Sequence, residues 1–179
     1  MPPRPHHHRR GFTLLDLLLT LLVIGILALA GVPVLRSALA NTRLTAAAAE
    51  LAGALDYARV LAVRYQRPFG VRADADAGSF EVFDRRYELD PAAHPDSTPP
   101  VDAGGVVRDP ATRNWFRRDF DALESCAGAR FAGLPAGDQV LFRPEGHCGA
   151  ADAVFELDLD GSRHRVTVSA ATGRVLSDG

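Results

Sequence analysis

Apolar residues follow two successive patterns in the first third of the chain. From Leu14 to Leu35 they run almost without interruption over 22 residues. A helix of that length rises about 33 Å, at roughly 1.5 Å per residue, which matches a hydrocarbon core of about 30 Å. After Pro33 apolar residues return on a helical period, at Leu44, Leu51, Leu55, Ala58, Ala62 and Tyr65. The pattern predicts one helix from about Leu14 to about Gln66, ending before Arg67-Pro68.

Beyond Pro68 the period of the apolar positions becomes two, which is typical of half-buried strands. The predicted strands are Phe69 to Arg72, Phe80 to Phe83, Gln139 to Phe142, Val154 to Leu159, Arg163 to Ser169 and a short Arg174 to Leu176. Between Glu88 and Asn114 lies a long loop rich in proline and glycine. The fold class expected is α+β, with a long N-terminal helix packed on an antiparallel β-sheet domain.

The clearest turn signal is Asp160-Gly161, because a tight hairpin turn needs positive φ at both central positions. This turn sets three pairs opposite one another: Asp158 with Arg163, Glu156 with Arg165, and Phe155 with Val166. Opposite charges on one face and apolar side chains on the other suit a sheet that is buried on one side. We therefore expect these charge pairs to be structural.

The segment from Leu14 to Leu35 is expected to span a membrane once. Arg9 and Arg10 precede it, which favours a cytoplasmic N-terminus and export of the remainder. A secretory signal peptide is the alternative, since Ala28-Leu29-Ala30 imitates a cleavage site, but the apolar run is too long for one. Asp16 is the anomaly, because a carboxylate in lipid costs several kcal/mol unless it has a partner. Either it lies shallow, where water or a lipid headgroup is its partner, or another subunit supplies a cation.

Residues 9–16, Arg-Arg-Gly-Phe-Thr-Leu-Leu-Asp, resemble the processing site of type IV prepilins and type II secretion pseudopilins. The resemblance implies cleavage by a prepilin peptidase between Gly11 and Phe12, followed by N-methylation of Phe12. It also implies that Asp16, the fifth mature residue, pairs with the N-terminal amine of an adjacent subunit. The family usually has Glu at this position, and Asp is one methylene shorter. Pro33 corresponds to a proline that kinks the family's helix, as the chemistry of proline itself predicts.

Within this family, three short stretches resemble the GspH/FimT branch: residues 41–47, Ala58-Arg59, and Gln66-Arg67-Pro68. The resemblance implies four segments: a leader at 1–11, a transmembrane and assembly half of the helix at 12–35, an amphipathic half at 36–67, and a periplasmic β-rich domain at 68–179 that includes the loop 88–114. The protein would lie in the inner membrane of a diderm bacterium, with its C-terminal domain in the periplasm.

The function that the resemblance implies is that of a minor pseudopilin of type II secretion. Such a subunit assembles with other pseudopilins into a periplasmic filament that drives protein export across the outer membrane. The runner-up is a FimT-like minor pilin of a type IV pilus, which would contact DNA during uptake. A third interpretation is a signal-anchored periplasmic binding module that never polymerises.

Net charge argues against a general nucleic-acid binder. The chain carries -2, and without the three leader arginines its 17 arginines face 22 acidic residues, a net charge of -5. Candidate contacts with nucleic acid are Arg117 and Arg118, in a string that interleaves arginine with aromatic residues. The same string also suits an amphipathic edge strand. A third candidate is Arg174, because Gly173-Arg174-Val175-Leu176 matches the first half of the Gly-Arg-x-Arg element of DNA-binding FimT proteins. Nucleic acid is not expected as a partner.

The remaining chemistry is sparse. Cys126 and Cys148 fit either one disulfide or two buried thiols, and export of the domain favours the disulfide. The loop 88–114 holds four aspartates, but it lacks the dense ligand spacing of a calcium loop. His147 beside Cys148 lacks the further ligands that a metal needs. No nucleophile motif and no phosphate loop occurs. We therefore expect no enzyme, no cofactor and no metal.

Overall fold

The computed structural model describes residues 14–91 and 99–178, and leaves the side chains of residues 30–34 outside the described part. The predicted cleavage and methylation positions, Gly11 and Phe12, also lie outside it. The chain divides into two compact units, one ending at Ala38 and the other running from Leu39 to Gly179.

Helix α1 spans Leu14–Tyr65, which confirms the long helix expected from the apolar pattern. Its end has a physical cause in the three residues that follow. Gln66 adopts a left-handed conformation with a φ of 53°. The Arg67 N–H then donates to the Ala62 carbonyl at 3.3 Å, a bond that closes the last turn of a helix. Pro68 cannot continue the helical hydrogen-bond pattern, so the chain leaves α1 in an extended conformation.

Two antiparallel sheets of four strands follow the helix. In spatial order the first sheet contains β3 (Arg117–Asp119), β2 (Ser79–Asp84), β1 (Phe69–Asp74) and β5 (Gln139–Phe142). The second contains β4 (Arg130–Gly133), β6 (Ala153–Leu159), β7 (Ser162–Val168) and β8 (Val175–Asp178). Two short helical turns connect these elements: α2 (Arg85–Leu89) follows β2, and η2 (Ala136–Asp138) precedes β5. All six predicted strands are present.

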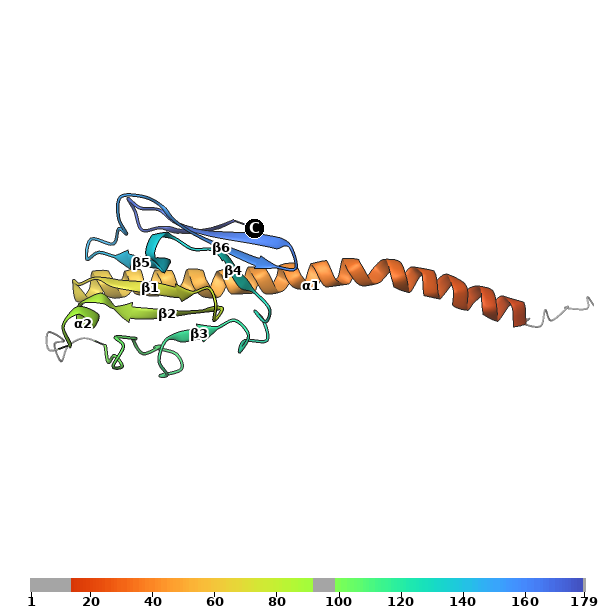
Figure 1. Cartoon of the computed structure of the whole chain (residues 1–179), viewed down its shortest axis with the longest axis horizontal. Coiled ribbons are helices and arrows are strands. Elements are labelled where there is room, and N and C mark those ends of the chain that lie inside the picture. Colours follow the sequence, from red (N-terminus) through yellow and green to blue (C-terminus); the bar gives the residue numbers. More distant parts are fainter. Residues whose placement is uncertain (1–13, 92–98, 179) are drawn as a thin grey trace, which may run out of the picture. The chain divides into compact units, whose positions relative to one another are not determined.

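The second half of α1 and both sheets share one hydrophobic core (Figure 1). Leu44, Leu51 and Leu55 of α1 are 0% exposed. A series of aromatic contacts links the two sheets, with ring centroids 5.2 to 6.3 Å apart, through Phe80, Phe120, Phe131 and Phe155. The helix therefore contributes the central element of the core.

The hairpin between β6 and β7 has the predicted turn and register. Asp160 and Gly161 have φ values of 52° and 82°, as a tight turn requires. The three predicted pairs are opposite one another: Asp158 with Arg163, Glu156 with Arg165, and Phe155 with Val166. Phe155 and Val166 are fully buried. The charged face is the outer face of this sheet, as the alternation of charged and apolar residues predicted.

Three elements lie where no strand or helix was expected: β4, α2 and η2. Strand β4 carries Phe131 into the core. Helix α2 begins between the predicted strand that ends at Phe83 and the predicted loop, and its last two residues lie in that loop. The predicted loop 88–114 is also partly ordered by pairing. Val101 forms a β-bridge with Val107, and Phe83 forms one with Val106. Val106 and Val107 are fully buried, so the later part of this loop belongs to the core.

The expected disulfide between Cys126 and Cys148 is wrong, because both cysteines are free thiols. Cys126 lies shortly before Arg130, which pairs with Asp158 near the end of β6. The Cys148 N–H donates to the carbonyl of Ala170, which lies beyond the end of β7 and so beside the start of β6. The length of β6, about 20 Å at roughly 3.3 Å per residue, separates two positions that a disulfide needs within about 7 Å.

Candidate functional site

The first half of α1 is an exposed apolar surface. Every large apolar side chain from Leu14 to Leu29 is exposed to solvent, and Leu29 reaches 80%. Further along the same helix the leucines are buried in the core of the sheet domain. Among the residues that the structure describes, no helix meets the length and apolarity required to cross a membrane. An exposed apolar surface of this size marks a site of interaction with another protein or with lipid.

Asp16 lies on this surface, in the first turn of α1. A carboxylate there complements the partial positive charge of the helix N-terminus. Its predicted partner, the amine of a processed neighbouring subunit, involves residues outside the described part. Pro33 lies within the bounds of α1, and its side chain also falls outside the described part. Both the pairing of Asp16 and the kink at Pro33 stay predictions.

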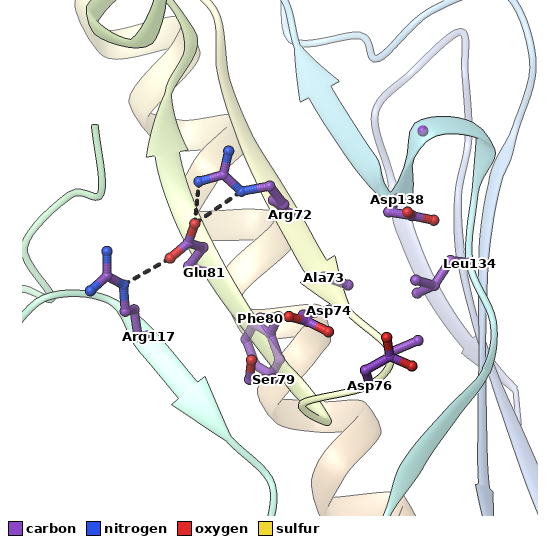
Figure 2. A pocket seen from close by; sticks show the side chains of 12 residues that line it. Arg72, Ala73, Asp74, Asp76, Ser79, Phe80, Glu81, Arg117, Leu134 and Asp138 are labelled. Atoms are coloured by element: carbon purple, nitrogen blue, oxygen red, sulfur yellow. Dashed lines mark hydrogen bonds and ion pairs between the residues drawn. The ribbon is translucent and has the colours of Figure 1, made fainter. Parts of the chain in front are cut away.

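On the first sheet, three charged residues form a row across neighbouring strands (Figure 2). Arg117 of β3 is opposite Glu81 of β2, and Glu81 is opposite Arg72 of β1. Arg117 Nε donates to Glu81 Oε2 at 2.8 Å, and Arg72 Nε donates to Glu81 Oε1 at 2.9 Å. Arg117 Nη2 also donates to Asp102 Oδ2 at 2.8 Å. The hydrogen bond to Glu81 raises the pKa of Arg117 above its ordinary value. The row is a cross-strand ladder that fixes the strand register.

A cavity of about 520 Å³ opens beside this row, between the β1–β2 hairpin and the segment around η2. Figure 2 shows Asp74 and Asp76 on the hairpin side and Asp138 with Leu134 on the opposite side. Among the described residues, no three His, Cys, Asp or Glu side chains come close enough to hold a metal ion.

Two aspartates of the loop 88–114, Asp102 and Asp109, each accept a hydrogen bond from an arginine. Asp102 accepts from Arg117 and from the N–H groups of Gly104 and Val106, at 2.8 and 2.9 Å. Asp109 accepts from Arg118. Asp96 lies outside the described part, and calcium binding by the whole loop stays untested.

A buried ion pair connects the end of α1 to the first sheet. Arg67, just after α1, contacts Asp84 at the end of β2, and both side chains are almost fully buried. The other carboxylate oxygen of Asp84 accepts from the N–H groups of Arg86 and Tyr87, at 3.0 and 3.2 Å, and so caps α2. Sequence reasoning missed this pair. The available signal was an aspartate directly after a strand and before a helix-forming stretch.

The three residues considered for nucleic-acid contact do not form one surface. Arg117 is engaged by Glu81 and Asp102, and Arg118 contacts Asp109 and lies 3.8 Å from Glu50 of α1. Arg174 is exposed, but it precedes β8 on the other sheet. Phe116, in the same string as Arg117, is buried and stacks on Tyr57 of α1 with centroids 5.4 Å apart. The string therefore forms an edge strand with an inward aromatic residue.

The described histidines and cysteines of the domain, which are His147, His164, Cys126 and Cys148, form no group that could hold a metal ion. His164 is buried, with Nε2 at 2.9 Å from Ser177 Oγ on the adjacent strand. His147 Nδ1 lies 3.9 Å from Glu145 Oε2. Burial raises the pKa of the Cys148 thiol, and Asp152 adds to the effect, so the reactive thiolate is disfavoured.

Comparison with known proteins identifies the family. The family model "Type II transport protein GspH" matches residues 47–172. The fold is similar to that of the minor pseudopilin EpsH from the type 2 secretion system of Vibrio cholerae, with a TM-score of 0.51, 15% identity, and coverage of 76% of this chain and 97% of that chain. It is also similar to the type IV minor pilin FimU of Pseudomonas aeruginosa strain PAO1, with a TM-score of 0.50, 20% identity, and coverage of 76% and 88%. The comparison with curated proteins gave no match.

Both solved structures share the arrangement of a long helix packed on antiparallel sheets, so the pilin-like α+β fold is confirmed. The family match covers more than two thirds of the chain, and includes most of the buried half of α1 and every strand from β1 to β7. The chain belongs to the GspH family of type II transport proteins.

Proposed function

We propose that this chain is a minor pseudopilin that joins other pseudopilins in a periplasmic filament and so drives protein export across the outer membrane. Its role is assembly and not catalysis, as the family of transport proteins suggests. The observation that carries the proposal is the change along α1, from leucines exposed up to Leu29 to leucines buried from Leu44 onward. One half of the helix is thus available to neighbouring subunits, while the other half holds the domain.

Before assembly, the segment 12–35 anchors the protein in the inner membrane, with the N-terminus cytoplasmic and the C-terminal domain periplasmic. The apolar run from Leu14 to Leu35 supports this, although the side chains of residues 30–34 lie outside the described part. Arg9 and Arg10 favour the cytoplasmic side for the leader. Prepilin peptidase is the processing partner, and it removes residues 1–11.

Asp16 acts in assembly through its charge. Cleavage after Gly11 creates a new amine on Phe12, and a buried carboxylate needs a nearby cation. The Asp16 carboxylate of one subunit would meet the amine of its neighbour inside the bundle of apolar helices. The pairing sets the axial register between subunits, because an apolar surface alone has no preferred register.

Processing is tested by the intact mass of the full-length protein extracted from membranes of a host with an active prepilin peptidase. The wild type is expected to lack residues 1–11 and to carry one added methyl group. Gly11→Val should keep the leader. Gly25→Val is the matched control, because Gly25 lies in α1 with nothing near its missing side chain, and it should be processed like the wild type. A wild-type protein with its Met1 terminus intact would refute the proposal and favour a plain membrane anchor.

Assembly is tested by cross-linking in a host with the other pseudopilins. Asp16→Ala should lose cross-links to them, whereas Asp16→Glu should retain them because it restores the carboxylate. Asp56→Ala is the control, since Asp56 is an exposed carboxylate on the domain half of α1. Equal cross-linking by Asp16→Ala and wild type would contradict a role for this charge.

The alternative, a FimT-like minor pilin that contacts DNA, depends on Arg174, which is exposed and follows Gly173 as in half of the FimT element. Its test is retention of the full-length protein on immobilised DNA. Salt-sensitive retention that is lost in Arg174→Ala but kept in Arg163→Ala would favour the pilus function. Absence of retention would leave the secretion function as the better proposal.

A further inference from the structure

A pocket lined by arginines and one tryptophan lies beside β3, the edge strand of the first sheet. It has a volume of about 410 Å³, and its lining residues are Arg108, Arg113, Asn114, Trp115 and Arg117. None of these residues is acidic. The Arg108 guanidinium lies 5.0 Å from the centroid of the Trp115 ring, and the two residues form a β-bridge. Neither this site nor its arginines Arg108 and Arg113 has a role in the function proposed above.

Residues 109–114, which form part of the pocket, are fixed by hydrogen bonds to Asp109. Asp109 is 3% exposed and accepts from the Ala111 N–H at 2.8 Å, from the Thr112 hydroxyl at 3.0 Å, and from Arg118. The Asp109 N–H donates to the Asn114 carbonyl at 2.8 Å. These bonds close the loop on itself. The pocket therefore exists before any partner arrives, and binding does not require ordering of the loop.

The backbone of Arg113 is strained in a way that places its side chain. Its φ is 61°, a left-handed conformation that residues other than glycine rarely adopt. The Arg113 N–H donates to the Asp109 carbonyl at 2.9 Å, and this bond holds the strained turn. Such strain costs of order 1–3 kcal/mol and concentrates where a side chain must be presented to a ligand. The loop thus presents Arg113 on the same pocket as Arg108.

The charges of this pocket are not balanced within the described part of the chain. Arg117 is engaged by Glu81 and Asp102, but among the described residues no carboxylate lies within 4.0 Å of Arg108 or Arg113. We infer that this pocket is a docking site for a carboxylate-bearing segment of a partner protein. Arg108 and Arg113 bind the acidic side chains of that segment, and Trp115 packs against the methylene groups of those side chains. Guanidinium groups suit this task because their planar donors match a carboxylate.

Two observations favour an acidic protein segment over a nucleic acid. Stacking of a base on the face of Trp115 that Arg108 covers would require displacement of Arg108. In addition, the whole chain has a net charge of -2, which repels a long polyanion, whereas a short acidic segment contacts only the pocket. The inference does not depend on filament assembly, and its failure would leave the proposed function untouched.

Trp115 is the single tryptophan of the chain, so its fluorescence reports directly on the pocket. The full-length protein in detergent is titrated with a short oligoglutamate peptide, with an oligoglutamine peptide of the same length, and with oligothymidylate. We expect a saturable change with oligoglutamate, no change with oligoglutamine, and weakening with added salt because the contacts are exposed ion pairs.

Arg108→Gln and Arg113→Gln, tested separately, should each weaken oligoglutamate binding about fivefold, the scale of one exposed ion pair. The matched control is Arg163→Gln, since Arg163 is 73% exposed on the other sheet and should not affect binding. Unfolding midpoints of the free variants establish that each is folded, and either pocket variant alone suffices for the test. The inference is overturned by no response to oligoglutamate, by equal weakening in Arg163→Gln, or by tighter binding of oligothymidylate.

Discussion

Replacement of Asp84 by asparagine should destabilise the domain more than any other single exchange of a carboxylate for an amide. The side chain of Asp84 is 0% exposed and that of its partner Arg67 is 4% exposed. Asparagine has nearly the same shape and caps a helix as well as aspartate, so α2 keeps its cap. The change therefore removes mainly the negative charge, and the buried Arg67 guanidinium loses its ion pair with the Asp84 carboxylate.

The expected cost is about 3–5 kcal/mol, the range for the loss of one partner of a buried ion pair. Total stabilities of domains are about 5–15 kcal/mol, so this loss is a large fraction. For a chain of this size, each kcal/mol lowers the unfolding midpoint by about 2–4 °C, which gives a shift of roughly 6–20 °C. Thermal unfolding followed by circular dichroism of the full-length protein measures this shift.

Asp158→Asn is the matched control. Asp158 lies 3.7 Å from Arg163, whose side chain is 73% exposed, so this exchange should cost no more than about 1 kcal/mol. A second variant tests the cause directly: adding Arg67→Met to Asp84→Asn removes the buried positive charge and should recover part of the lost stability. The reasoning is refuted if Asp84→Asn and Asp158→Asn shift the midpoint equally, or if the double variant is less stable than Asp84→Asn alone.

Three further predictions follow from single sites. Gly173→Ala should lower the free energy of unfolding by at least about 1–2 kcal/mol, because Gly173 has a φ of 63° and a Cβ there would lie 1.9 Å from a carbonyl oxygen. Its control is Gly53→Ala, in open space on α1, which should raise the free energy of unfolding by up to about 1 kcal/mol. Burial alone would raise the pKa of Asp109, but hydrogen bonds from a guanidinium, an N–H and a hydroxyl hold this pKa below the ordinary value of an aspartate. Its stabilisation is therefore full at neutral pH and is lost as the pH falls through the folded-state value, so denaturation curves of wild type and Asp109→Asn should converge in acid. Without reductant, Cys126 and Cys148 should both react with a thiol reagent after unfolding, and Cys148 should react slowly in the folded protein; an unreactive unfolded chain would indicate a disulfide.

The sequence predicted those elements whose turn residues or helix-ending residues agree with the pattern of apolar and polar positions. The apolar residues of α1 repeat on a helical period, and Gln66-Arg67-Pro68 ends the helix by local backbone preference alone. Likewise, Asp160-Gly161 fixes the register of β6 and β7, because the turn type and the alternation of charged and apolar residues demand the same pairing. For these elements, distant parts of the chain add little information.

The missed features depend on contacts between distant residues. Strand β4 has only four residues, and its Phe131 belongs to a strand because it packs between Phe120 and Phe155. The disulfide expectation was wrong for the same reason. The number of cysteines does not reveal that the fold places Cys126 and Cys148 near opposite ends of β6. Asp84 carries the sequence signal of a helix cap, but its pairing with Arg67 could not be predicted, because the two residues come together only when α1 and β2 share the core.

The two halves of α1 place different demands on the sequence, and this explains how proteins of low sequence identity share the fold. In the domain half, Leu44 and Leu51 need only apolar neighbours of suitable volume, and cores tolerate many substitutions that keep volume and period. A shared fold at 15% and 20% identity with EpsH and FimU is the expected consequence. Exposed residues of the domain, such as Arg108 and Arg113, are free of that demand. Differences between family members should therefore concentrate on such exposed surfaces of the domain.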